Sequence, residues 1–216
     1  MRYTLNKGQQ TLNNMLIKMC EEVERIMIGC MECLKNMDRD KVDYWMQEDQ
    51  LVNDLEWSID NECVRLIATQ HPVAKDLRKI VSAIRISTDL ERMSDLAVGV
   101  AKTVRRIDEP LCMPLTDILL MEEKALEMMR LGIEAYRTED MEMARSLAGN
   151  DDEVDGLCKR VLTELQDIMM KKPECSVQGI QLVIICRYLE RFADHATNIG
   201  ESVIYIATAE RTELNN

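Results

Sequence analysis

The sequence has few of the residues that interrupt helices or favour sheets. Its 216 residues include only 8 Gly and 4 Pro, and aromatic residues make up 4% of the chain. Leu, Met, Ala, Glu, Lys and Arg, which are good helix formers, occur throughout. The composition therefore argues against a sheet-rich domain and predicts an all-α protein.

Basic residues are also in short supply. The chain has 27 Lys and Arg against 39 Asp and Glu, a formal net charge of −12. A nucleic-acid binder normally presents a basic face to the phosphates, so we expect no nucleic-acid partner. An acidic surface instead suits solubility and the binding of cations or basic proteins.

Long apolar runs are missing as well. No uncharged apolar run approaches the roughly 18 residues that a membrane span requires. The amino-terminal segment MRYTLNKGQQT lacks the apolar core of a signal peptide. We therefore expect a cytoplasmic protein.

Cys30 and Cys33 form the one close cysteine pair among the 8 cysteines. No second Cys-x-x-Cys motif or nearby histidine completes a four-ligand metal site. Both cysteines fall on the apolar seam of a helix expected over 12–37. We interpret them as small apolar core residues.

Breaks in the apolar pattern divide the chain into six long helices. Five are expected at 12–37, 41–69, 73–107, 139–170 and 176–209, and the fourth has an apolar seam that runs from Ile118 to Ala135. The tail RTELNN is expected to fray. Pro72 separates the second helix from the third. The stretch from Asp108 to Pro114 contains two prolines and is the best boundary between halves. We predict two tandem antiparallel three-helix bundles, 1–107 and 115–216, joined by a linker at 108–114. A continuous six-helix array is the competing arrangement.

An internal repeat supports this division. The segment RYLERFADHATNIGE at 187–201 has a weaker copy, DLERMSDLAVGVAK, at 89–102. Glu190 aligns with Glu91 (190 − 91 = 99), and Asp194 aligns with Asp95 at the same offset. Each copy keeps Glu-x-x-x-Asp, which puts two carboxylates on one face of a helix. The apolar seam also repeats, so the chain is interpreted as a duplication.

Counting residues from each turn places further acidic residues at matching heights along neighbouring antiparallel helices. Asp49 and Asp95 each lie 23 residues from Pro72, one before it and one after it. An antiparallel hairpin would therefore gather a first acid stripe, consisting of Asp49, Asn53, Glu91 and Asp95. Counting from Pro173 in the same way, Asp151 and Asp155 lie 22 and 18 residues before it, and Glu190 and Asp194 lie 17 and 21 residues after it. These four residues form a second acid stripe.

Converging carboxylates repel one another unless cations neutralise them. Oxygen ligands of this kind suit iron, manganese, magnesium or calcium, and zinc less selectively. His195 could add a nitrogen ligand to the second acid stripe. In the alternative interpretation, Arg92, Arg187 and Arg191 pair with acids three residues away, and the stripes are solvated helix faces.

Three segments resemble the PhoU family of phosphate-uptake regulators. ERMSDLAVGV at 91–100 and RYLERFADHATNIGE at 187–201 are similar to its two signatures, and TQHPVAKDLR at 69–78 is similar to the turn between them. The resemblance covers essentially the whole chain. It implies two similar three-helix bundles and a non-enzymatic regulator that acts with the phosphate ABC transporter and a sensor histidine kinase. Such a regulator would reach the membrane only through these partners, and a homodimer is one state it could adopt.

The resemblance also implies metal clusters, of iron or zinc, bound by Asp/Glu-x-x-x-Asp motifs. Here these motifs correspond to metal ligands Asp151, Asp155, Glu190, Asp194, Glu91, Asp95 and Asp49. Two positions depart from the pattern in the first half. Asn53 carries an amide where a carboxylate is expected, and Gly99 stands where the signature usually has Asn, as Asn198 does in the second half.

Two other functions compete with this interpretation. A ferritin-like di-metal oxidase needs two Glu-x-x-His motifs, but Ala68 and Phe192 precede the two histidines at that spacing. No catalytic triad order or phosphate-binding glycine loop stands out either, so we expect no enzyme. A helical adaptor that binds no metal differs from the first interpretation only in its acid stripes.

Overall fold

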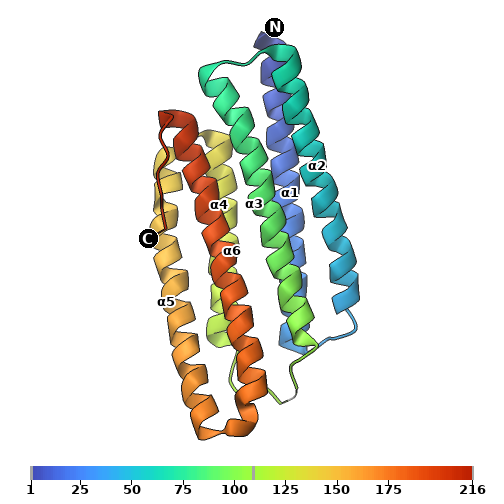
Figure 1. Ribbon diagram of the computed structural model, residues 1–216, viewed down its shortest axis with the longest axis vertical. Coiled ribbons are helices and arrows are strands. Elements are labelled where there is room, and N and C mark those ends of the chain that lie inside the picture. The colour runs from blue at the N-terminus through green and yellow to red at the C-terminus, as the bar shows by residue number, and fades with distance from the viewer. Residues whose placement is uncertain (1, 109, 216) are drawn as a thin grey trace.

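The computed structural model describes residues 2–108 and 110–215, which form six long helices and no strand (Figure 1). The helices are α1 (Arg2–Asn36), α2 (Val42–Gln70), α3 (Ala74–Val104), α4 (Thr116–Thr138), α5 (Met141–Lys171) and α6 (Ser176–Thr208), with a short 3₁₀ turn at Pro173–Cys175. The all-α prediction is confirmed. None of these described helices has the length and apolar character needed to span a membrane.

Helix α1 begins ten residues earlier than the pattern indicated. The expected start at Leu12 is wrong because Leu5 and Gly8 continue the buried face toward the amino terminus. Gly8 lies so close to α2 that an added Cβ would come 2.3 Å from a methyl carbon of Leu66. The Gln9 side-chain amide also donates to Asp76 at the start of α3, at 3.0 Å. These contacts extend α1 along the full length of its neighbours.

The other helix ends agree with the sequence pattern to within a few residues. Helix α2 ends at Gln70, and His71 takes a left-handed backbone conformation with φ of 48° before Pro72. Such a residue commonly terminates a helix because it turns the chain away from the helical path. The expected break at His71-Pro72 is confirmed.

The helices pack as two antiparallel three-helix bundles that lie side by side (Figure 1). Helices α1, α2 and α3 form one bundle, and α4, α5 and α6 form the other. Helix α3 packs against α6 and α1 packs against α4, whereas α2 and α5 lie on the outside. The equivalent helices α3 and α6 run in opposite directions (Figure 1). This arrangement confirms two bundles instead of a continuous array, and one hydrophobic core joins them.

Polar contacts link the bundles along their length. The Arg78 guanidinium donates to the Ile206 carbonyl oxygen at 2.9 Å, joining α3 to α6. Arg130 of α4 pairs with Glu24 of α1 at 2.7 Å. Exposed ion pairs contribute about 1 kcal/mol or less, so these contacts orient the bundles while the shared apolar core stabilises them.

The segment between the bundles is docked on the second half. Gln178 of α6 donates its amide to the Asp108 carbonyl oxygen and accepts from the Cys112 backbone N–H. Met113 and Leu115 are buried in the core. The expected linker therefore has a fixed path across the described part of 108–114.

The carboxy-terminal tail is packed, and the expectation that it frays is wrong for residues 211–215. The Leu214 backbone N–H donates to the Glu201 carboxylate at 2.9 Å, and the Leu214 side chain lies against the core. The Asn215 amide donates to Asp194 at 3.1 Å. One apolar anchor and two acceptors on α6 thus hold the tail along that helix.

The close cysteine pair behaves as expected. Cys30 and Cys33 of α1 are 0% and 1% exposed and carry free thiols. Burial raises the pKa of the Cys33 thiol, which keeps it protonated at neutral pH. The interpretation of these residues as core residues is confirmed.

Candidate functional site

The second acid stripe lies where α5 runs antiparallel to α6. The pKa of Asp151 is raised to about 7, first by burial and then by the neighbouring negative charges, chiefly those of Asp194 and Asp155, with Glu190 also contributing. Burial also raises the pKa of Asp194, helped by Glu190 and Asp155. Charges influence a carboxyl pKa in this way only at short range. The structure therefore brings together the four residues that were matched by counting from Pro173.

Two cations sit at the edge of this stripe. Arg187 contacts both oxygens of Glu190 at 2.6 Å, and Lys159 contacts Asp155 at 3.2 Å. The Lys159–Asp155 pair lies within α5 and the Arg187–Glu190 pair lies within α6, so neither ion pair joins the two helices. The acids that face one another between the helices keep part of their mutual repulsion.

The first acid stripe is assembled in the same way between α2 and α3. Burial raises the pKa of Asp49, and the charge of Asp95 adds to the effect, while a hydrogen bond from the Ser94 hydroxyl opposes it. Burial likewise raises the pKa of Glu91, followed by the charges of Asp95, Glu56 and Asp49. The structure thus supports the expected gathering of these acids.

Of the three arginine pairs that spacing suggested, one forms. Arg187 pairs with Glu190, but Arg92 and Arg191 make no ion pair within 4.0 Å in the part of the chain that the structure describes. Arg191 still lowers the pKa of Asp194 through its charge, as the weakest of the contributions. Helix-face pairing therefore does not account for most of the stripe carboxylates.

The stripes fit a cation by charge and by donor type. Both offer hard oxygen donors, and burial, with a smaller contribution from neighbouring carboxylates, raises the pKa values of Asp49, Glu91, Asp151 and Asp194. Within residues 2–108 and 110–215, no three His, Cys, Asp or Glu side chains converge closely enough to hold one ion as they stand. Side-chain rotation would be needed to form a coordination sphere, and the seven ligand assignments stay predictions.

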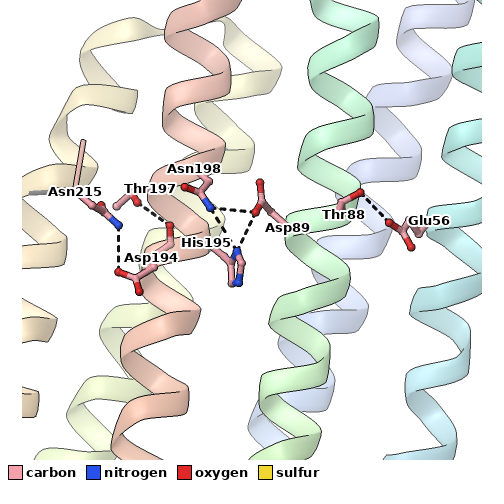
Figure 2. A network of polar contacts seen from close by, with 8 residues as sticks. All are labelled: Glu56, Thr88, Asp89, Asp194, His195, Thr197, Asn198 and Asn215. Carbon is pink, nitrogen blue, oxygen red and sulfur yellow. Dashed lines mark hydrogen bonds and ion pairs between the residues drawn. The ribbon is translucent and has the colours of Figure 1, made fainter. Parts of the chain in front are cut away.

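His195 is engaged away from the second acid stripe. Its Nδ1 lies 2.9 Å from the Asp89 carboxylate across the α3–α6 interface, and the Asn198 amide donates to the same oxygen at 3.1 Å (Figure 2). The suggestion that His195 adds a ligand to the stripe therefore does not match the structure. The neighbouring Asp194 points the other way and receives the Asn215 amide (Figure 2).

Asp89 is the site residue that sequence reasoning missed. It is buried and accepts from both His195 and Asn198, but the repeat gives no sign of it because its equivalent at the 99-residue offset is Tyr188. One weak signal was available. A charged residue directly before the apolar Leu90 lies on the boundary of the seam, where it can reach a neighbouring helix.

A comparison with known protein families agrees with the duplication of the two halves. The model of the PhoU domain matches the chain twice, over residues 16–104 and 118–203. The chain belongs to the PhoU family. Each match covers one three-helix bundle and includes the acid stripe of that half.

Other PhoU family members match over most of their length. The phosphate-specific transport system accessory protein PhoU homolog of Clostridium acetobutylicum is 35% identical over 209 residues, covering 96% of this chain and 95% of that protein. The crystal structure of PhoU from Pseudomonas aeruginosa has a TM-score of 0.86 at 29% identity, covering 95% of this chain and 99% of that one. The crystal structure of PhoU from Streptococcus pneumoniae has a TM-score of 0.90 at 26% identity, covering 97% of this chain and 99% of that one. The duplicated all-helical fold is therefore a PhoU fold.

Asn53 and Gly99, the two departures from the PhoU signatures, lie in different structural environments. Asn53 lies half-buried on the first acid stripe, where it offers an oxygen without a charge. Gly99 lies beside Tyr188 of α6, and an added Cβ would come within 2.9 Å of that ring. Asparagine at position 99 would require Tyr188 to move, so the two residues fit as a pair.

Replacing Asp89 by Ala should destabilise the α3–α6 interface. The change removes the acceptor of His195 and of the Asn198 amide and leaves two partly buried donors. Hydrogen bonds to a charged group contribute about 1.5–3 kcal/mol, so we expect a loss of about 2 kcal/mol. Thermal unfolding should show a midpoint about 4–8 °C lower. The exposed Asp167→Ala variant is the control, and equal midpoints for the two variants would contradict the role assigned to Asp89.

Stability of the metal-free protein should fall as pH rises because of Asp151. Its folded-state pKa of about 7 lies above the ordinary value of 3.8, so the folded state binds more protons. The penalty is absent below about pH 4 and fully present above about pH 8. One pKa unit corresponds to about 1.4 kcal/mol. The stripe is open to solvent, so screening reduces the effect to about 1–2 kcal/mol.

The Asp151→Asn variant tests this pH dependence. We expect it to be more stable than the wild type at pH 8 and similar at pH 4, as measured by urea unfolding in the presence of a chelator. Asp167→Asn serves as the control. A variant that is less stable than the wild type at pH 8 would show that Asp151 is neutralised in the folded protein.

Proposed function

We propose that this chain is a cytoplasmic, non-enzymatic regulator of phosphate uptake. It acts with the phosphate ABC transporter and a sensor histidine kinase and represses the phosphate-starvation response when phosphate is plentiful. The observation that carries the proposal is the match of the family model to both halves, together with full-length relatives named as accessory proteins of the phosphate-specific transport system. An accessory protein exerts its effect by binding its partners, which suits a rigid double bundle.

The acid stripes add metal binding to this proposal. Asp151, Asp155, Glu190 and Asp194 would hold the more tightly bound ions, and Asp49, Glu91 and Asp95 would hold the weaker ones. Hard carboxylate oxygens favour iron, with zinc as a less selective occupant, and several oxygens per stripe suit a multinuclear cluster. The ions would neutralise the stripes and fix the outer helices α2 and α5 against α3 and α6.

A metal-free helical adaptor is the second candidate. The Arg187–Glu190 and Lys159–Asp155 pairs favour it because they supply part of the neutralising charge without any ion. Metal analysis of gently purified protein separates the two candidates. The same preparation would give the molar mass in solution and so test the homodimer.

The test of the proposed function is the phosphate response of cells that lack the chain. Starvation genes should be expressed even when phosphate is abundant. Normal repression in the deletion strain would refute the proposal.

A further inference from the structure

A groove between α3 and α6 carries an uneven charge. At one end it opens into a cavity of about 460 Å³ whose lining includes Arg92, Asp95, Lys102, Arg191 and His195. We call this cavity the basic end of the groove. Three cations and one carboxylate gather there in a chain whose net charge is −12. A positive pocket on an acidic protein marks a place where anions are attracted.

The three cations at the basic end have no ion-pair partner among the residues that the structure describes. Arg92, Lys102 and Arg191 form no ion pair within 4.0 Å and no side-chain hydrogen bond in the described ranges 2–108 and 110–215. All three side chains are exposed, so they are free to close on a ligand. Arg92 and Arg191 are also equivalent in the duplication (191 − 92 = 99), which places one arginine from each half in the same cavity.

The opposite end of the groove provides an internal comparison. A cavity of about 510 Å³ there has Arg85, Arg92 and Arg211 in its lining, but Asp89, Glu201 and Glu213 balance them. The duplication explains part of the difference, because Glu201 occupies the position equivalent to Lys102 (201 − 102 = 99). The two halves have therefore diverged so that only one end of the groove is basic.

The chemistry of the basic end specifies the kind of anion. Arginine recognises oxyanions through pairs of parallel N–H···O bonds, and lysine adds a point charge. Asp95 would repel a fully deprotonated anion, but its carboxylate can accept a hydrogen bond from an anion that keeps a proton. Phosphate retains one proton near neutral pH and sulfate does not. His195 lines the cavity. Its Nδ1 faces the Asp89 carboxylate (Figure 2).

We propose that the basic end of the α3–α6 groove binds a protonated phosphate-type oxyanion, held by Arg92, Lys102 and Arg191 and selected by Asp95. The site shares Asp95 with the first acid stripe, lies outside the α5–α6 acid stripe and needs no metal ion. This proposal is argued only from the residues that line the groove, and it goes beyond the regulatory role proposed above.

The test is calorimetric titration of the full-length, chelator-treated protein with inorganic phosphate and, separately, with sulfate at low ionic strength. We expect saturable phosphate binding and sulfate binding at least about tenfold weaker. Arg92→Gln and Arg191→Gln should each weaken phosphate binding about tenfold, because each removes a charged hydrogen-bond donor. Asp95→Asn should reduce the preference for phosphate over sulfate. Arg145→Gln on the exposed face of α5 is the matched control and should bind as the wild type does.

Three results would overturn the inference. The first is the absence of saturable phosphate binding at millimolar concentrations. The second is unchanged binding in an Arg92→Gln, Arg191→Gln double variant that unfolds at the wild-type temperature. The third is binding that appears only after iron is added and disappears in Glu190→Gln, which would assign the anion to the acid stripe. None of these results bears on the genetic test of the regulatory role, so the two proposals can fail separately.

Discussion

Replacing Glu190 by Gln should weaken metal binding at the second acid stripe by about 100-fold, and Asp155→Asn should have a similar effect. Each change removes one anionic ligand from a set of four and leaves the shape of the side chain intact. Affinity for a hard cation depends strongly on the number of charged ligands, and 100-fold corresponds to about 2.7 kcal/mol. The measurement is metal content after gentle purification, followed by titration with iron, manganese and zinc.

The first acid stripe should bind the same ions more weakly. It has three carboxylates because Asn53 supplies an amide, which can coordinate but carries no charge. Asn53→Asp should therefore raise the affinity of the first stripe toward that of the second. This gain-of-function variant is informative because nonspecific damage to the fold would not increase binding. If the wild type holds no more metal than Glu190→Gln and Asp155→Asn, the stripes are charged helix faces.

Much of the fold follows from local patterns that the structure preserves. Helix breaks could be predicted because Pro72 and the prolines of the 108–114 segment constrain the backbone wherever they occur. Antiparallel pairing then follows from the short connections. Counting residues from a turn gives the height of a side chain along a helical hairpin, so the members of each acid stripe could be predicted from the sequence.

Contacts between the halves could not be predicted in the same way. The Asp89–His195 bond joins residues 106 positions apart, and neither the repeat nor the helical period indicates which face of α3 meets α6. The packing of the tail depends on one leucine and two acceptors on α6, which is too little for a sequence pattern to reveal. The early start of α1 likewise depends on Leu66 and Asp76, which lie on other helices.

The basic end of the groove shows the same limit. In the alternative interpretation of the sequence, Arg92 pairs with Asp95 and Arg191 pairs with Asp194, because helical spacing favours such pairs. The structure directs the two arginines toward the groove instead, where they share a cavity with Lys102. Their role depends on the approach of two helices from different halves.

Loss of the chain should switch on the phosphate-starvation response fully in phosphate-rich medium, which is the largest effect that we expect. The reason is that a repressor acting through a transporter and a kinase has its influence only while it is bound to them. Complementation with the wild type should restore repression, and the exposed-surface variant Arg145→Gln should do so equally well. Glu190→Gln in the same strain shows whether metal binding contributes to repression.

The decisive measurement is the activity of a starvation-gene reporter in the deletion strain at high phosphate, compared with the complemented strain. We predict full expression without the chain and repression when it is restored. Equal repression in both strains would contradict the proposal that this chain represses the phosphate-starvation response.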